Sequence, residues 1–221
     1  KSLISVVNYV DGKKHGVSEA YRNDKLYKTK YYTNGKLNGS YTVYMDNKIF
    51  SVKYFIDGKL NGESITYYPK DIFVSEYLNG KLHGRMYGYK YTGEILSIHS
   101  YRNNKLDGLV AIYHDNGNIS HKINYKNGKI IDDKVEYFYP NGGINEVFRY
   151  KKGKEIRSGY TRWYTNGALE QVGYMNGNIF TSNYTHWDEN GILLEKVVTK
   201  GDKMRLYTYH VNGEVKYKTK I

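Results

Sequence analysis

The chain has 221 residues, a formal net charge of +12, and an apolar fraction that depends on 27 Tyr rather than on long aliphatic runs. This reliance on tyrosine argues against a thick aliphatic core, and together with 23 Gly and only 2 Pro it favours strand-rich, turn-rich structure. The absence of Cys excludes a disulfide framework and a thiolate metal site, and no apolar run reaches the roughly 18 residues that a membrane-spanning helix needs.

The first predicted element along the chain is a β-strand over residues 4–10. The sequence offers it no preceding strand, so we expect this edge to pair with upstream residues or with another chain. Because the chain starts at Lys1 rather than at methionine, we expect an upstream segment to have been removed, either as a signal peptide or by design of the polypeptide. A secreted or surface-exposed location and a cytoplasmic one both stay open. Heavy use of Lys, Asn, Ile and Tyr points to an AT-rich bacterial genome.

A turn motif then recurs about nine times, at intervals of 22 to 25 residues. Its fullest form reads Tyr-x-Asn-Gly-Lys-Leu-x-Gly, as in residues 32–39 and 77–84. Asn-Gly and Asp-Gly supply the positive φ angles that tight hairpins require. These first turns lie at Gly12, Gly35, Gly58, Gly80, Asn104, Gly128, Gly153, Gly177 and Gly201.

A second turn lies halfway through each repeat, so that every repeat contains two turns and two short β-prone segments. These turns are predicted at Asp24, Asn47, Asp71, Gly93, Gly117, Gly142, Gly167, Gly191 and Gly213. Glycine every dozen residues excludes stable helices, and a propeller blade needs about 40 residues. The predicted fold is therefore all-β, an elongated single-layer twisted antiparallel meander of about nine tandem β-hairpin repeats and about eighteen strands.

We expect one repeat domain over residues 1–221, in which residues 1–128 follow the consensus most closely. Over residues 129–221 the repeats are degenerate, because the second glycine is replaced by Asp132, displaced to Gly159, or lost at Thr181 and Arg205. The basic tail over residues 216–220 is predicted to cap the array at its C-terminal end.

The repeated motif resembles the MORN repeat, especially its shorter bacterial variant of the YwqK type, whose members carry an antitoxin label. The resemblance covers nearly the whole chain and is strongest in the first five repeats. It implies a single twisted sheet of stacked hairpins that contacts proteins and, in some members, membrane lipids. It implies no catalytic residues.

Stacked repeats should align equivalent residues into rows along the sheet. A first aromatic row precedes the first turns, and a second precedes the second turns. We weigh two interpretations, a structural core and an exposed platform that stacks against a sugar or a base. The first row contains Tyr9, Tyr32, Phe55, Tyr77, Tyr101, Tyr125, Tyr150 and Tyr174, before Val198. After Ala20 and Val43, the second row, our possible aromatic platform, contains Tyr67, Tyr89, Tyr113, Phe138, Trp163, Trp187 and Tyr209.

A row of lysines directly follows the first turns, which predicts one basic edge. Successive lysines of this row are two strands apart, a spacing of about 10 Å. This spacing is close to one Debye length, so the repulsion between neighbouring lysines is modest. Two interpretations stay open, a solvated edge that prevents aggregation and an edge that binds an anion or a partner. The row consists of Lys13, Lys36, Lys59, Lys81, Lys105, Lys129 and Lys154.

Catalytic and nucleotide-binding motifs do not rise above background, so we expect no catalytic residue, no cofactor and no specific nucleic-acid motif. The nearest approach to a metal site is His114 and His121 with Asp132, Asp133 and Glu136, whose spacing matches no metal-binding signature. We expect no metal there.

The preferred functional hypothesis is a non-catalytic scaffold that binds a protein partner through the sheet face or edge. The first alternative is binding of an anionic surface, a lipid headgroup or a charged polymer, through the lysine edge. The second alternative is an antitoxin or immunity protein that occludes a toxin.

Overall fold

A computed structural model describes residues 3–150, 158–176, 179–200 and 203–220. These residues form twenty β-strands and no helix. Strands that follow one another pair antiparallel, except that β12 and β13 both pair with β11. Contacts divide the chain into two compact units, Lys1–Val110 and Ala111–Ile221, with the boundary inside β10. The predicted all-β open meander of hairpins is confirmed. The single repeat domain and its elongated shape stay predictions.

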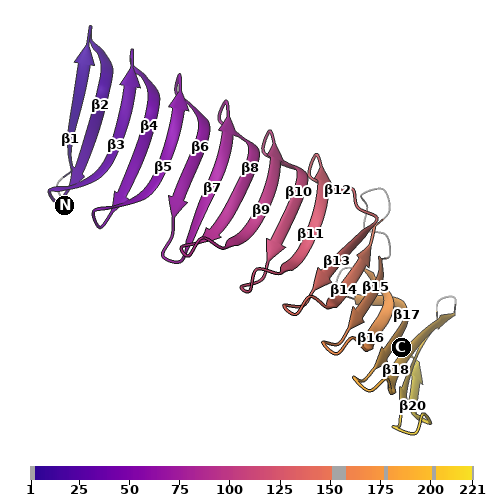
Figure 1. Ribbon diagram of the computed structural model, residues 1–221. Helices are drawn as coiled ribbons and strands as arrows, with labels where there is room; N and C mark the ends of the chain where they lie inside the picture. Colours follow the sequence, from indigo (N-terminus) through magenta and orange to yellow (C-terminus); the bar gives the residue numbers. More distant parts are fainter. Residues whose placement is uncertain (1–2, 151–157, 177–178, 201–202, 221) are drawn as a thin grey trace. The chain divides into compact units, whose positions relative to one another are not determined.

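Unit 1 is built from strands of similar length that reverse direction at each turn (Figure 1). Its strands are β1 (Leu3–Val10), β2 (Lys13–Arg22), β3 (Lys25–Thr33), β4 (Lys36–Met45), β5 (Lys48–Ile56), β6 (Lys59–Tyr67), β7 (Asp71–Leu78), β8 (Lys81–Lys90), β9 (Ile95–Arg102) and the first part of β10 (Lys105–Tyr113).

Unit 2 contains the end of β10 and shorter, less regular strands. They are β11 (Ile119–Lys126), β12 (Lys129–Ile130), β13 (Lys134–Phe138), β14 (Ile144–Arg149), β15 (Ser158–Trp163), β16 (Leu169–Asn176), β17 (Ile179–Trp187), β18 (Leu193–Lys200), β19 (Lys203–Tyr209) and β20 (Val215–Lys220).

The strand count exceeds the predicted eighteen for two reasons. A meander has one strand more than it has turns, and β12 and β13 are separated where Asp132 replaces the repeat's second glycine. The Asp132 carboxylate accepts hydrogen bonds from the Asn124 backbone N, at 2.6 Å, and from Asn124 Nδ2, at 3.1 Å. A side chain thus takes the place of regular strand pairing at this position.

The first turns that the structure describes, through Asn127 and Gly128, are two-residue hairpin loops in which both loop residues have positive φ. At Asn34 and Gly35, for example, φ is 49° and 83°. The turn residue also donates a backbone hydrogen bond to the preceding repeat, from Gly35 N to Lys14 O at 2.8 Å and from Gly58 N to Leu37 O at 2.7 Å. The first turns of unit 1 are therefore fixed to one another along one edge.

The second glycine of the motif lies opposite the first aromatic row. Gly39 has a φ of 116° and lies directly opposite Phe55, whose other cross-strand neighbour is Leu60. The same arrangement places Tyr32 opposite Gly16, Tyr77 opposite Gly62 and Tyr101 opposite Gly84. Since directly paired residues point to the same side, these aromatics share one face of unit 1, which we call the first-row face.

The second turns change loop length along the chain. Those of the first three repeats are two-residue loops. The third loop contains Pro69 and Lys70, so the predicted turn at Asp71 is corrected, because Asp71 begins β7. Later second turns are three-residue loops closed by a glycine with positive φ, as at Gly117, whose N donates to His114 O at 2.9 Å.

This change in loop length corrects the start of the second aromatic row. In the structure, the aromatics of the second row pair across the second turns with aliphatic residues. By this criterion the row begins with Tyr21, opposite Leu26, and Tyr44, opposite Ile49. The sequence prediction took the residue four positions before each second turn and so placed Ala20 and Val43 in the row. These are one position too early, because the first two second-turn loops are shorter. The row continues in each unit through Tyr67, Tyr89, Phe138, Trp163, Trp187 and Tyr209, each paired with Ile, Leu or Val.

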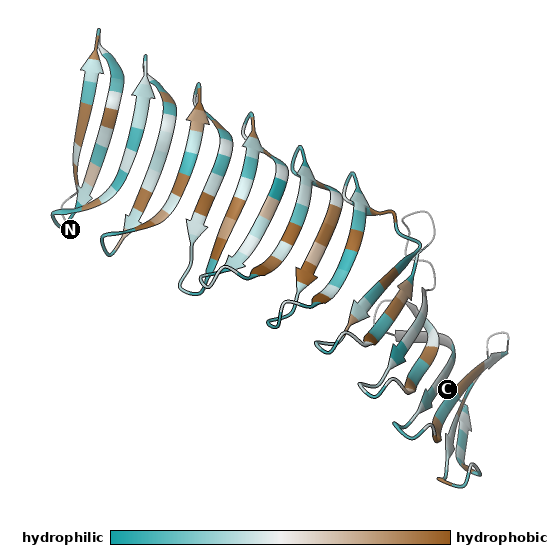
Figure 2. Cartoon of the chain, viewed as in Figure 1, coloured by the Kyte–Doolittle hydropathy of each residue, from teal (hydrophilic) through white to brown (hydrophobic). Residues whose placement is uncertain are grey.

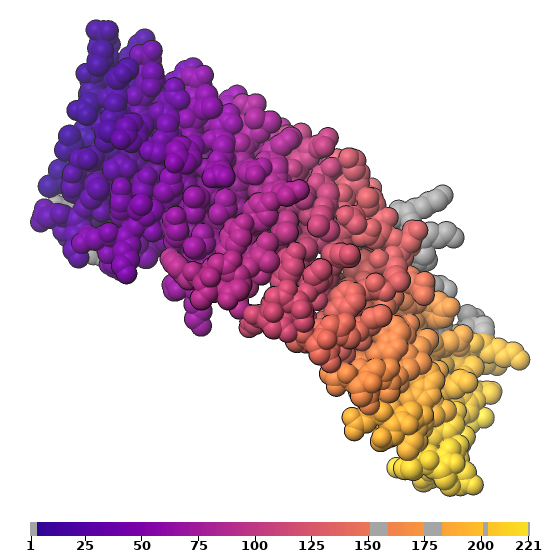
Figure 3. All heavy atoms as spheres, viewed as in Figure 1, coloured from indigo at the N-terminus to yellow at the C-terminus, as the bar shows by residue number. Residues whose placement is uncertain are grey.

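The most deeply buried residues come from neither aromatic row, whose members are mostly half-buried, so the choice between a core and an exposed platform stays open. Large side chains instead cover small residues in mid-strand. The ring of Phe73, for instance, lies over Gly88, where an added Cβ would be 3.1 Å from Cε1. Figure 2 shows apolar residues as short patches within strands, and Figure 3 shows side chains covering the backbone of unit 1 on the face in view. The buried set comprises Ala20, Thr42, Ser51, Ser64 and Ser97, then Val110, Ala111, Ile123, Val135, Val147, Tyr160, Tyr184 and Val197.

Candidate functional site

The first-turn edge of unit 1 carries the predicted lysine row. Each lysine is the first residue of an even-numbered strand and is exposed, from Lys13 in β2 to Lys105 in β10. Lys36 Nζ lies 3.7 Å from Asp57 Oδ1, a pair exposed enough to contribute little stability. In unit 2, Lys129 begins β12 and is exposed, whereas Lys154 lies outside the described residues. A basic edge is thus present in unit 1.

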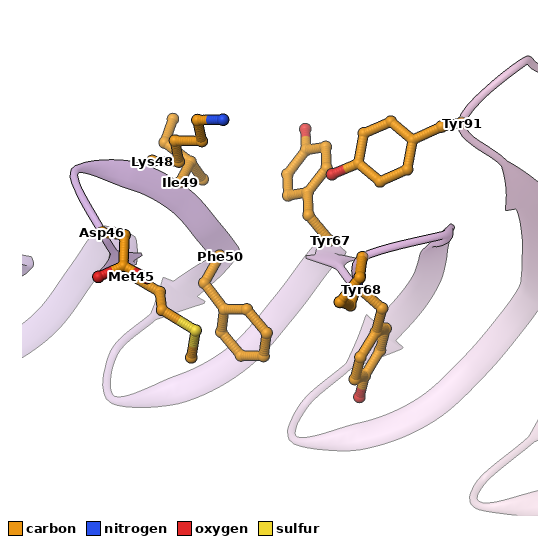
Figure 4. Close-up of a pocket in the computed structure, with 9 residues that line it drawn as sticks. Met45, Asp46, Lys48, Ile49, Phe50, Tyr67, Tyr68 and Tyr91 are labelled. Atoms are coloured by element: carbon orange, nitrogen blue, oxygen red, sulfur yellow. The ribbon is translucent and has the colours of Figure 1, made fainter.

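The second-turn edge of unit 1 carries an apolar groove of about 560 Å³. Figure 4 shows side chains of the β4–β5 turn facing those of the β6–β7 and β8–β9 turns across it. Several of these side chains are unusually exposed for their size, with Met45 at 58%, Tyr91 at 57% and Tyr68 at 47%. The groove is lined by Met45, Asp46, Lys48, Ile49, Phe50, Tyr67, Tyr68, Pro69 and Tyr91.

Aromatic packing holds one wall of this groove in place. Phe50 and Tyr68 meet edge to face with ring centroids 5.9 Å apart, and Tyr68 meets Phe73 in the same way at 5.7 Å. Edge-to-face contacts of this kind stabilise an aromatic cluster beyond the area that it buries. The wall is therefore ordered before any ligand arrives.

Unit 2 has a counterpart groove of about 690 Å³ between two of its own second turns. It includes Tyr113, Ile119, Lys122 and Phe138. The two turns are connected by the Asn116 side chain, whose Nδ2 donates to the carbonyl oxygen of Pro140 at 2.7 Å. A groove beside the second turns therefore occurs in both units.

The predicted aromatic platform is only partly gathered into these grooves. Tyr67 lines the groove of unit 1, while Tyr113 and Phe138 line that of unit 2. Tyr89 instead stacks on Tyr87 at 5.8 Å. Trp163, Trp187 and Tyr209 are half-buried beside Leu169, Leu193 and Val215.

The sequence reasoning missed Tyr68, Tyr91 and Met45, which lie in or beside the loops and so outside the aromatic rows. The available signal was a tyrosine directly after a strand, followed by Pro69 in one case and by Thr92 and Gly93 in the other.

The candidate metal ligands contact different neighbours and do not face one common point. His114 Nε2 lies 2.8 Å from the carbonyl oxygen of Phe138, His121 packs on the Tyr137 ring at 4.6 Å, and Asp132 accepts hydrogen bonds from Asn124. Lys134 Nζ lies 2.7 Å from Glu136 Oε1. Over the described ranges, His, Asp and Glu side chains form no group of three that could hold a metal ion.

One face of unit 2 carries a partly buried ionic cluster. Arg162 donates from Nε and Nη2 to Glu146 Oε1, at 2.9 and 2.5 Å, and its Nη1 lies 3.7 Å from Glu170 Oε1. Tyr160 OH donates to the same Glu146 oxygen at 3.4 Å. Since the strands that hold these groups pair directly, the cluster fastens β14 to β15.

Burial on this face raises the pKa of Tyr184 to about 12 and also raises the pKa of Tyr160 and Tyr137. A phenol whose folded pKa lies above its unfolded value of about 10 stabilises the fold below pH 10, and this contribution is lost as the pH rises toward 12. We expect unit 2 to lose stability in that interval, monitored by phenolate absorbance and by the fluorescence of Trp163 and Trp187. A Tyr184→Phe variant should lose part of the late titration. Complete ionisation of the tyrosines near pH 10 with unchanged fluorescence would contradict this.

The first strand, β1, exposes several apolar side chains, including Ile4 at 52% and Val6 at 50%. Among the described residues it pairs with β2. Its pairing with another chain stays a prediction. The described residues contain no helix with the length and apolar character needed to cross a bilayer.

The fold and these surfaces define an antiparallel hairpin-repeat protein with one basic turn edge and one apolar turn edge in unit 1. A family model, the MORN repeat variant, matches residues 106–127, and this supports the resemblance to MORN repeats. Members of that family are generally non-catalytic repeat modules that take part in protein or membrane interaction. No curated protein matches the chain.

Proposed function

We propose that the protein is a non-catalytic scaffold that binds a protein partner through the second-turn groove of unit 1. The observation that carries the proposal is the concentration of exposed Met45, Tyr68 and Tyr91 around a groove whose wall is already packed. Tyrosine and methionine are enriched in the centres of protein interfaces, where a few aromatic anchors dominate affinity.

A photo-crosslinking amino acid at Tyr91 tests this proposal in a native lysate. We expect a protein to be captured there, because the side chain stands at the open rim of the groove (Figure 4). The matched control carries the same amino acid at Leu78, which is 45% exposed beside a first turn and so on the opposite edge. Capture from Leu78 alone, or retention of lipid without protein, would refute the groove as the binding site.

Binding of an anionic surface through the lysine edge is the second candidate function. It is favoured by the exposed lysines at the starts of β2, β4, β6, β8 and β10. Headgroup phosphates or a charged polymer would meet this edge as a row of point charges.

Changing Lys36, Lys59, Lys81 and Lys105 together to Gln separates the two functions. The fold should persist, since exposed charges away from packed features change stability by about 0.5 kcal/mol or less. For a groove-bound partner we expect slower association by about threefold and a weaker response to salt, with affinity retained. Surface plasmon resonance with the captured partner measures both. Complete loss of partner binding by the folded variant would favour the anionic surface instead. An antitoxin or immunity role stays a prediction from the family resemblance.

A further inference from the structure

Five cationic side chains gather on the first-row face of unit 1, away from the turn lysines. Cross-strand pairing places them there: Lys14 lies opposite Tyr9, Lys30 lies between Ser18 and Tyr41, and Lys53 lies between Tyr41 and Ser64. The other two are Arg22 and Lys28, which follow the same alternation in β2 and β3.

Tyrosine rings hold four of these cations in place. Lys14 Nζ lies 5.3 Å from the Tyr32 ring centroid, and Lys30 Nζ lies 4.9 Å from that of Tyr41. A third ring, Tyr27, is approached by two cations, the Arg22 guanidinium at 4.7 Å and Lys28 Nζ at 4.9 Å. Cation–π contacts restrict these long side chains without neutralising them. The positive charges are therefore positioned in advance of binding.

No carboxylate shares this face over residues 3–67, the described part of β1 to β6. Glu19 and Glu63 alternate onto the opposite face, where Tyr21 OH donates to Glu19 Oε2 at 2.6 Å. The remaining acids of this segment are turn residues, namely Asp11, Asp24, Asp46 and Asp57. An acid-free sheet face with five cations attracts anions over the whole patch.

We propose that this patch of Lys14, Arg22, Lys28, Lys30 and Lys53 binds an acidic segment of a protein partner in extended conformation. Residues two apart on a strand are separated by about 7 Å, and strands two apart by about 10 Å, so the cations match carboxylates at alternate positions of an extended chain. The ring faces of Tyr27, Tyr32 and Tyr41 are occupied by cations, which disfavours stacked bases or sugars. The proposal does not depend on the second-turn groove.

Fluorescence anisotropy with a labelled glutamate decapeptide at low salt tests the patch in the full chain. The Lys30→Gln/Lys53→Gln variant should bind this probe about tenfold more weakly than the unchanged protein, because each lost contact is charge-assisted. The Lys70→Gln/Lys196→Gln variant removes the same charge from exposed positions outside the patch and should change affinity less than about twofold. Far-ultraviolet circular dichroism checks that both variants stay folded.

Two results would overturn the proposal. Equal loss of affinity in both double variants would show a general charge effect rather than a patch. Tighter binding of a thymidine decanucleotide than of the glutamate decapeptide would assign the face to nucleic acid. Neither result bears on capture at Tyr91, so the groove and the patch are tested separately.

Discussion

Replacing Gly39 by alanine is expected to lower the free energy of unfolding of unit 1 by about 2–3 kcal/mol. Its φ of 116° is unfavourable for a residue with a side chain, and an added Cβ would lie 3.0 Å from Tyr31 Cβ. Tyr31 Cβ is fixed by the backbone of β3, so the strands themselves would have to separate. Urea denaturation followed by circular dichroism, with amide exchange in β3 and β4, measures the loss.

The matched control is Gly12→Ala at a first turn. Gly12 has a φ of 70° but no atom within 4 Å of an added Cβ, so only the conformational strain remains, about 1 kcal/mol. A similar loss in the two variants would mean that close approach of the strands is not what requires the second glycine.

The hairpins could be predicted from the sequence because their cause is local. Asn-Gly and Asp-Gly tolerate the positive φ of two-residue loops, as at Asn34 and Gly35, whatever surrounds them. The second glycine was equally easy to recognise, since it recurs two residues after Leu in the motif. Its loss at Asp132 marked the place where β12 ends, although the division into two strands was not foreseen.

The candidate groove was harder to predict from the sequence, because it depends on packing between different repeats. Phe50, Tyr68 and Tyr91 come from three successive repeats, and only the stacking of the hairpins brings them together. A count from each turn also fails where loop length changes, which is why Tyr21 and Tyr44 were missed from the second row.

The cationic patch leaves only a weak repeat signal. Lys30 and Lys53 both lie five residues before a first-turn glycine, but Lys28 has no such counterpart. The turn lysines recur in more repeats and so drew the functional hypothesis to the edge. The common face of the patch cations follows only from strand register, in which a shift of one residue would move every side chain to the other side.

Replacing Arg162 by methionine is expected to lower the free energy of unfolding of unit 2 by about 2 kcal/mol. Removal of one partner from a buried ion pair costs about 3–5 kcal/mol, and the loss should be smaller here because the Arg162 side chain is 37% exposed. The described ladder between β14 and β15 has two paired positions, of which Glu146 with Arg162 is one. The substitution would leave Glu146 and Glu170 together on this face without their shared cation.

A Glu146→Gln/Arg162→Met variant separates two causes of the lost stability. One is the loss of the ion pair, and the other is the unpaired Glu146 carboxylate that the single substitution leaves behind. If an unpaired carboxylate causes most of the loss, the double variant should regain at least half of it, because a neutral amide at position 146 no longer faces Glu170 as a like charge. Trp163 and Trp187 both lie in unit 2, so tryptophan fluorescence during urea denaturation reports on this unit selectively. Equal stability of the single and double variants would show that Arg162 acts through packing over the Tyr160 ring, 5.5 Å from its guanidinium, rather than through its charge.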